Sequence, residues 1–179
     1  MNVFCGLGMG ELLKGWFPGL KVIEAGWYQQ IEDKGLKITF LPAQHWSKRS
    51  VHDGGQRLWG AFMIQGNGIS LYYSGDTGYS NHFTEIPELF GAPDYALLGI
   101  GAYKPRWFMQ PNHISPYDSL TASAEMQARM TIPMHYGTFD LSDEPLSDPP
   151  KVFAEEARKR NIPVAVPALG EIVKLEKKR

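Results

Sequence analysis

Histidine and aspartate side chains follow several of the strands that the sequence predicts. The segment Ile69–Tyr73 is β-branched, apolar or aromatic, which indicates a buried strand. Asp76 comes directly after it, in a polar turn where Gly75 and Gly78 permit a tight backbone. A lone aspartate in such a turn is usually only a turn former. The position of the histidines gives Asp76 a possible chemical role as well.

Three of the five histidines, His45, His113 and His135, also come at or after the ends of predicted strands. Imidazole and carboxylate groups at strand ends suit a borderline metal such as zinc, because the sheet fixes their separation while the loops leave a coordination position open. Each histidine also has a plainer interpretation: His113 could bond a loop carbonyl, and His135 could be a satisfied core histidine. We expect His52 and His82 to lie on the surface. No short His-x-His or Cys-x-x-Cys signature is present.

The elements that would position these residues alternate along the chain. The pattern predicts strands at 21–25, 28–32, 36–41, 58–65, 69–73, 94–100, 132–135, 164–166 and 171–175, and helices over 11–17, 81–90, 116–130 and 148–159. The segments Asp33-Lys34-Gly35 and Gly66-Asn67-Gly68 predict hairpin turns. We expect Gly99–Asn112 to be a loop, and Ser115-Pro116 to cap the helix that follows. This order is typical of α/β or α+β architecture.

The composition excludes several classes of protein. A length of 179 residues predicts one domain with a substantial core. Eighteen basic and nineteen acidic residues give a formal net charge of -1, so no global field attracts nucleic acid or an anionic membrane. The single Cys5 excludes an internal disulfide and fits a reducing compartment. No apolar run approaches the roughly 20 residues of a membrane span, and no leader pattern opens the chain. We therefore expect a soluble protein, cytoplasmic or peripheral at the membrane.

Four segments together resemble one known family: PAQHWSKR (42–49), SGDTGY (74–79), IGAYKPRWFMQPNHISP (100–116) and PMHYGTF (133–139). In this order, and over most of the chain, they are similar to the metallo-β-lactamase-fold hydrolases related to N-acyl-phosphatidylethanolamine-hydrolysing phospholipase D. The third segment is specific to that branch. The resemblance implies an α+β protein built as a four-layer αβ/βα sandwich, with two zinc ions between two sheets.

The same resemblance implies roles for individual residues. His45 would bind the first zinc ion, Asp76 would bridge both ions, and His135 would bind the second. His113 would lie beside the cleft and contact the phosphate or acyl-amide head of the substrate. The implied reaction is hydrolysis of a phosphodiester, such as a phospholipid, by a water molecule that two metal ions roughly 3.5–4 Å apart activate.

The segment 100–116 contributes most of the remaining candidates. The candidates for substrate binding are His113, Arg106, Tyr103 and Trp107. Arg106 and Lys104 could steady a phosphate or be solvated loop charges. The aromatic residues Trp46, Trp107 and Phe108 could line an acyl groove or belong to the core.

One motif of this family has no counterpart in the sequence. The family's His-x-His-x-Asp-His motif supplies most of its metal ligands and belongs to the N-terminal half of the sandwich, whereas the resemblance begins at residue 1, past that point. We therefore expect residues 1–179 to form a single partial domain, the C-terminal half, with one mixed sheet and flanking helices. One apolar sheet face would then lack its partner, which predicts self-association, a complementing N-terminal half supplied by another chain, or poor solubility.

Three functional hypotheses follow. The first is a zinc-dependent hydrolase of the phospholipase D type described above, incomplete in this chain because three ligands divided between two ions do not make a competent centre. The second is an inactive half-domain or interaction module that binds no metal. The third is a hydrolase of the same fold that acts on another substrate, such as a sugar-phosphate lactone. Metal content separates the first two, and substrate profiling separates the first from the third.

Overall fold

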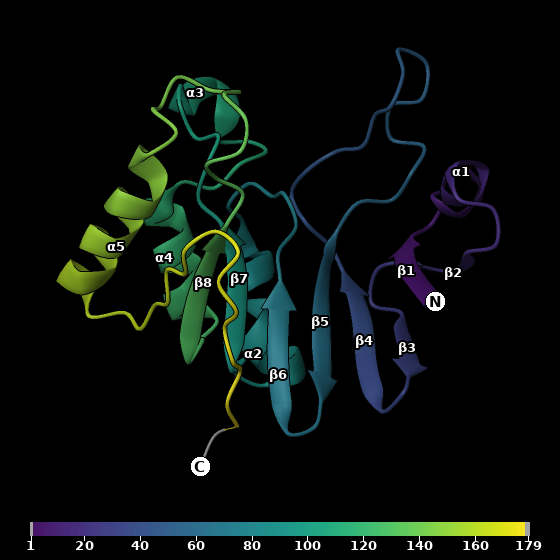
Figure 1. Cartoon of the computed structure of the whole chain (residues 1–179), viewed down its shortest axis with the longest axis horizontal. Coiled ribbons are helices and arrows are strands. Elements are labelled where there is room, and N and C mark those ends of the chain that lie inside the picture. The colour runs from purple at the N-terminus through teal and green to yellow at the C-terminus, as the bar shows by residue number, and fades with distance from the viewer. Residues whose placement is uncertain (1, 178–179) are drawn as a thin grey trace.

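A six-stranded mixed sheet organises the chain, and its strands lie in the order β3-β4-β5-β6-β7-β8 (Figure 1). The strands are β3 (Gln30–Asp33), β4 (Leu36–Leu41), β5 (Ala61–Gly66), β6 (Ile69–Tyr73), β7 (Tyr95–Gly99) and β8 (Met130–Met134). Neighbours from β3 to β6 pair antiparallel, and β6, β7 and β8 pair parallel. The computed structural model describes residues 2–177. The predicted α+β class, with one mixed sheet and flanking helices, is confirmed.

The alternation of side chains along the strands gives the sheet two different faces. Met63 lies opposite Tyr72 in the β5–β6 register, and both side chains are fully buried. Phe62 and Tyr73 form the next pair along and point to the other face, where Tyr73 keeps 39% of its surface exposed. One face therefore carries the main core, and the other is only partly covered.

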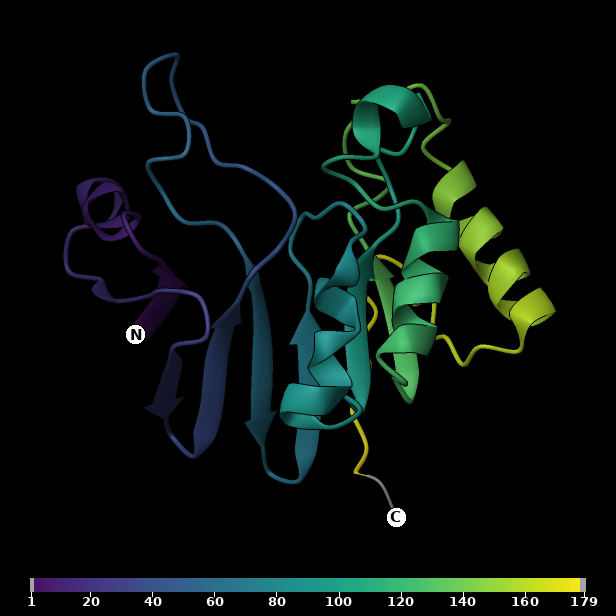
Figure 2. The same ribbon diagram turned by 180° about the vertical axis from the view of Figure 1, so that it is seen from behind.

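Helices cover the core face. The helices α2 (Glu85–Phe90) and α4 (Pro116–Glu125) lie across β6, β7 and β8 (Figure 2). Residues from both layers form one buried cluster, which includes Tyr72, Phe83, Leu98, Ile114 and Met126. A second cluster of Ile100, Leu120, Phe153 and Ala157 fixes α5 (Asp148–Arg160) against α4. These contacts hold the parallel half of the sheet rigid.

A small unit precedes the sheet. The strands β1 (Asn2–Gly6) and β2 (Lys21–Ala25) pair in parallel, with α1 (Gly10–Trp16) between them, and lie beyond the β3–β4 side of the sheet (Figure 1). The predicted strand at 21–25 is confirmed to the residue, whereas β1 was not expected. A backbone hydrogen bond from Leu58 N to Leu7 O (2.8 Å) ties this unit to the chain before β5.

The two strands predicted near the C-terminus, at 164–166 and 171–175, are wrong. Val164 makes only an isolated parallel bridge to Thr131, because the prolines on either side of 164–166 have no N–H to donate to a ladder. Further along, the Tyr95 hydroxyl bonds the backbone N and O of Glu176, at 2.7 and 3.1 Å. The tail thus crosses the sheet face opposite α2 and α4 without adding strands (Figures 1 and 2).

Three other boundaries differ from the prediction. The helix expected over 116–130 ends at Glu125, because Gln127 has a left-handed backbone (φ 55°) and Met130 already pairs in β8. The helix expected over 81–90 is divided into a 3₁₀ turn, η1 (Asn81–Phe83), and α2. The expected loop Gly99–Asn112 contains a short helix, α3 (Arg106–Met109).

The strands that matter for chemistry all end at one edge. β4, β6, β7 and β8 run in the same direction, so their carboxyl ends lie together at the top of the sheet in Figure 1. The connections that leave this edge hold every histidine and aspartate that the sequence marked as a metal candidate. Within residues 2–177, no helix is both long and apolar enough to cross a membrane.

Candidate metal centre

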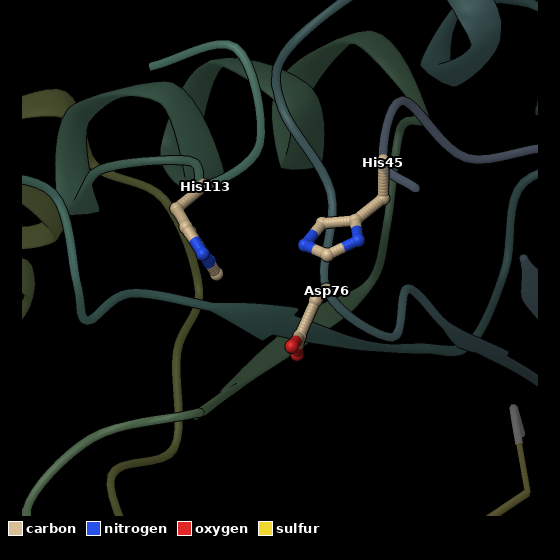
Figure 3. Close-up of side chains that lie close together, drawn as sticks. All are labelled: His45, Asp76 and His113. Atoms are coloured by element: carbon tan, nitrogen blue, oxygen red, sulfur yellow. The ribbon is translucent and has the colours of Figure 1, made fainter. Parts of the chain in front are cut away.

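Three side chains converge at this edge from three different connections. His45 follows β4, Asp76 follows β6, and His113 lies between β7 and α4. One possible ligand atom from each lies within 4.8 Å of the other two. Figure 3 shows the two imidazole rings and the carboxylate directed toward a common space.

His135 adds a fourth possible donor close to Asp76. It directly follows β8, and its Nε2 lies 3.5 Å from Asp76 Oδ1. Its ring stacks on that of His113, with centroids 5.2 Å apart, and His113 in turn lies 5.4 Å from His45. Asp76 therefore lies close to all three histidines, His45, His113 and His135.

Gln44 ties the three converging connections together. Its backbone N donates to Thr77 Oγ1 (3.0 Å), its backbone O accepts from Gly78 N (2.7 Å), and its side chain donates to the carbonyl of Pro111 (2.9 Å). A Cβ at Gly78 would lie 2.4 Å from the Pro111 oxygen, so glycine is required there. Gln44 thus positions His45, the next residue in the chain. The sequence did not predict this role, because a single glutamine belongs to no recognisable motif.

Close backbone packing also fixes His135. A Cβ at Gly101 would lie 2.2 Å from the carbonyl oxygen of His135, so only glycine lets the segment after β7 pass this close. His135 itself has a left-handed backbone (φ 58°), which is uncommon for a residue other than glycine. Such a conformation persists only where the surroundings enforce it, and it often accompanies function.

Hydrogen bonding and burial decide which imidazole nitrogens are available to a metal. His45 Nδ1 lies 2.8 Å from the carbonyl oxygen of Trp46, which can only accept, so Nδ1–H donates and Nε2 is the atom left to bind a metal. Burial, together with the nearby His135, lowers the pKa of His113 to about 4, so its ring is neutral at pH 7. The hydrogen bond between Asp76 and His135 lowers the pKa of the carboxyl and raises that of the imidazole.

The donor set fits a divalent metal of the zinc type. Imidazole nitrogens and a carboxylate are its usual ligands, and ligand atoms that lie this close together can share one ion. In the part of the chain that the structure describes, this is the only group of three or more such residues. The residues present are enough for one ion and leave a second ion short of ligands.

The two histidines expected on the surface behave differently. His52 is exposed, as predicted. His82 is not, because its ring packs on Phe83 with centroids 4.0 Å apart and its Nδ1 lies 2.6 Å from Ser80 Oγ. Burial lowers the pKa of His82 to about 4. Its place in η1, which folds back on the core, was not visible in the sequence.

The other candidates from 100–116 lie in varied surroundings. Arg106 pairs with Asp118 (Nη1 to Oδ2, 2.7 Å), which is also part of the capping box of α4. Tyr103 is 4% exposed, whereas Trp107 is 82% exposed. The side chain of Lys104 lies over the Tyr103 ring, with Nζ 5.5 Å from the centroid. Their roles toward a substrate stay predictions.

Two cavities open on either side of the centre. The larger, about 530 Å³, reaches His45 and Asp76 and is lined by apolar rings, including Phe40, Phe62 and Trp46, and by the cations Lys48, Arg49 and Arg57. The smaller, about 290 Å³, reaches His135 from the other side. Its buried carboxylate, Glu144, was missed from the sequence, where nothing distinguishes it from the other acidic residues of its loop.

Comparisons with known proteins show the family to which the chain belongs. The family model described as "Beta-lactamase superfamily domain" matches residues 1–136. An uncharacterized protein of Mycobacterium tuberculosis is 33% identical over 172 residues, which cover 93% of this chain and 45% of that protein. N-acyl-phosphatidylethanolamine-hydrolyzing phospholipase D 1 of Caenorhabditis elegans is 37% identical over 125 residues, which cover 67% of this chain and 35% of the enzyme. The chain thus spans less than half the length of these relatives.

A solved structure gives the same result for the fold. The structure of a metallo hydrolase from the archaeon Ignicoccus hospitalis superposes with a TM-score of 0.74 at 26% identity. The superposition covers 98% of this chain and 69% of that one.

Proposed function

Because the chain belongs to the β-lactamase superfamily domain family and has its metallo-β-lactamase fold, we propose that it forms the C-terminal part of a zinc-dependent hydrolase. The substrate we propose is a phosphodiester of the N-acyl-phosphatidylethanolamine type. The likeness to the phospholipase D of Caenorhabditis elegans supports this choice over other hydrolases of the same fold.

The observation that carries the proposal is the convergence of His45, Asp76 and His113 within 4.8 Å, with His135 3.5 Å from Asp76. We assign His45, Asp76 and His135 to metal binding, with Asp76 shared between two ions. His113 then faces the substrate, and its neutral ring can accept or donate a proton there.

When bound, zinc acts as a Lewis acid and lowers the pKa of a water molecule toward neutrality. The chain's own residues do the rest. Asp76 holds His135 through their hydrogen bond, and Gln44 keeps the connections of His45, Asp76 and His113 at a fixed separation. A hydrolytic centre requires ligands that are held rigidly, because the activation free energy rises when the reacting groups are displaced.

The larger cavity supports a lipid phosphodiester as substrate. Its apolar rings offer a surface for an acyl chain, and Lys48 and Arg49 offer positive charge for a phosphate close to His45. Arg57 is less available, because it pairs with Asp53. Such a cavity suits an amphiphile with an anionic head, whereas a sugar-phosphate lactone would use its cations and leave its apolar rings without a partner.

A two-zinc centre needs ligands beyond those in this sequence, which contains no His-x-His pair. We propose that a complementing half, carried by another chain, supplies them. Without it, the chain would hold metal without efficient turnover, and it would act as an incomplete half rather than as an enzyme.

The experiment is to combine the zinc-loaded chain with a complementing N-terminal half, such as that of a full-length relative, to add vesicles that contain N-acyl-phosphatidylethanolamine, and to measure release of the N-acylethanolamine and phosphatidic acid. We expect turnover that Asp76→Asn reduces by at least roughly 100-fold, since a shared ligand is lost. His52→Ala, an exposed histidine outside both cavities, should leave turnover unchanged. Turnover that is equal in the wild type and Asp76→Asn contradicts the proposal, and hydrolysis of a lactone alone favours the third hypothesis.

A further inference from the structure

The smaller cavity is not needed by any step proposed above. It lies between the end of β8, the connection 136–147 and the start of α5, with a volume of about 290 Å³. Most of its wall is apolar or aromatic, and the residues that matter most are Tyr136, Phe139, Leu141 and Leu146. His135 is part of the same wall, so the cavity adjoins the candidate metal centre.

Glu144 places a buried carboxylate in this apolar wall. It is only 4% exposed, and it accepts backbone hydrogen bonds from Tyr103 N (3.0 Å) and Lys104 N (2.9 Å). A carboxylate has about four lone-pair positions, so two bonds leave acceptor capacity unused. Across residues 2–177, no lysine, arginine or histidine forms an ion pair with it.

The charge around Glu144 is uniformly negative in its own loop. Residues 137–150 contain four acidic residues, Asp140, Asp143, Glu144 and Asp148, and no basic residue. Lys104 bonds Glu144 through its backbone N–H, but its ammonium group lies over the ring of Tyr103. A buried charge is costly unless a partner compensates for it, so this wall favours a ligand that brings positive charge.

The aromatic residues agree with that charge. The rings of Tyr136 and Phe139 line the cavity together with Glu144. Aromatic faces attract ammonium groups, and they do so more strongly where water is excluded. An anion would meet the negative charge of Glu144 and of its loop, and a neutral apolar molecule would leave the carboxylate without a charged partner.

We propose that this cavity binds a small organic ammonium group, with its nitrogen at Glu144 and its carbon chain against the aromatic and aliphatic walls. The larger cavity, with Lys48 and Arg49, favours anions. The centre thus lies between a side that favours anions and a side that favours cations. Ammonium binding at Glu144 does not rest on the proposed hydrolytic function, because the proposed substrate carries an acylated, uncharged nitrogen.

The test uses calorimetric titration of the metal-free chain with three probes of the same length, hexylammonium, 1-hexanol and hexanoate. We expect hexylammonium to bind at least roughly tenfold more tightly than 1-hexanol, because its charged nitrogen donates a charge-assisted hydrogen bond to Glu144 that the hydroxyl group cannot match. Hexanoate should not bind. Equal affinity for hexylammonium and 1-hexanol would overturn the proposal.

Variants locate the binding. Glu144→Gln should weaken hexylammonium at least roughly tenfold, and Phe139→Ala should weaken it severalfold. Glu88→Gln removes the same charge from an exposed position on α2 and should change nothing. Glu144→Gln also removes one acceptor for a backbone N–H, so it could disturb the loop as well as the binding. Phe139→Ala separates the two effects, because Phe139 is 73% exposed and can be truncated without unfolding the loop. Binding that survives both variants overturns the proposal, and it does so whether or not the chain holds metal.

Discussion

Asp76 is the residue on which the candidate centre depends. Its carboxylate lies 3.5 Å from His135 Nε2 and within ligand distance of His45 and His113. The geometry of His113 suits a metal ligand, whereas the family resemblance assigns this residue to the substrate.

Alanine variants separate these two roles. We expect His135→Ala to lower zinc affinity by more than about tenfold and His113→Ala to keep the zinc affinity but lower turnover. Competition with a chelating dye measures the affinity directly. The reverse pattern, with metal lost from His113→Ala and kept by His135→Ala, would assign His113 as the ligand.

The burial of His82 predicts how the stability of the fold depends on pH. Its pKa is lowered from 6.5 to about 4 by burial, so between these values the unfolded chain binds a proton that the folded chain does not. Its contribution therefore makes the free energy of unfolding rise with pH across this window and fall as the pH drops toward 4. His82→Gln should flatten that slope in urea titrations at pH 4.5 to 7. His52→Gln, at an exposed site, should leave it unchanged, and the contribution of His113 remains in both variants.

At the scale of elements, the centre depends on α4 beginning where it does. The cap of α4 is complete, because Ser115 accepts from Asp118 N and the Asp118 side chain accepts from Ser115 N. Asp118 also pairs with Arg106, so the cap links α4 to α3 and to the connection that carries His113. The pattern Ser-Pro-x-Asp was recognisable in the sequence, and the capping prediction is confirmed.

Ser115→Ala should therefore destabilise the fold by about 1 kcal/mol, the usual cost of losing an N-cap. Ser147→Ala is the matched control, since Ser147 precedes α5 without a side-chain cap and should cost little. Thermal or urea unfolding measures both. Equal effects of the two substitutions would contradict the role of the cap.

The sequence predicted those elements whose signal is local. The strands at 21–25 and 69–73 are β-branched or aromatic runs bounded by turn residues, and both are confirmed to the residue. The strand at 2–6 was missed because it is short and pairs only with β2, about twenty positions along the chain. The tail was expected to pair because its apolar residues resemble a strand, and its prolines prevented this.

The candidate centre could be predicted only in part for the same reason. The types of residue and their place after strands pointed to Asp76, His45, His113 and His135, and the family resemblance then divided them between metal and substrate. The contacts of Gln44, the burial of His82 and the pocket around Glu144 arise from tertiary packing, which no local pattern encodes.

At the scale of the whole molecule, one sheet face is left partly open. Two rows of apolar side chains that run across the strands form this face. One row consists of Phe40, Phe62, Tyr73 and Leu97, and the other of Ile38, Ile64, Leu71 and Tyr95. The outer strands are partly shielded, since Ile38, Phe40 and Tyr95 are buried, but the middle of each row is only half-buried. An apolar face of this kind favours association with another sheet.

We expect the chain to associate in a concentration-dependent way in light scattering. Ile64→Lys places a charge in the middle of the open face and should shift the chain toward monomer. Val51→Lys adds the same charge to a loop residue that is 79% exposed and should have no effect. A wild-type chain that is monomeric at all concentrations would contradict the expected association.

The most direct test of the account is elemental analysis of the purified chain after zinc loading and removal of free metal, with Asp76→Ala measured alongside. The account predicts at least about one zinc ion per chain in the wild type, since one ion has a sufficient set of donors here, and loss of that ion in Asp76→Ala. A wild-type chain that retains no stoichiometric metal would contradict it and would leave the chain as a half-domain without its own metal centre.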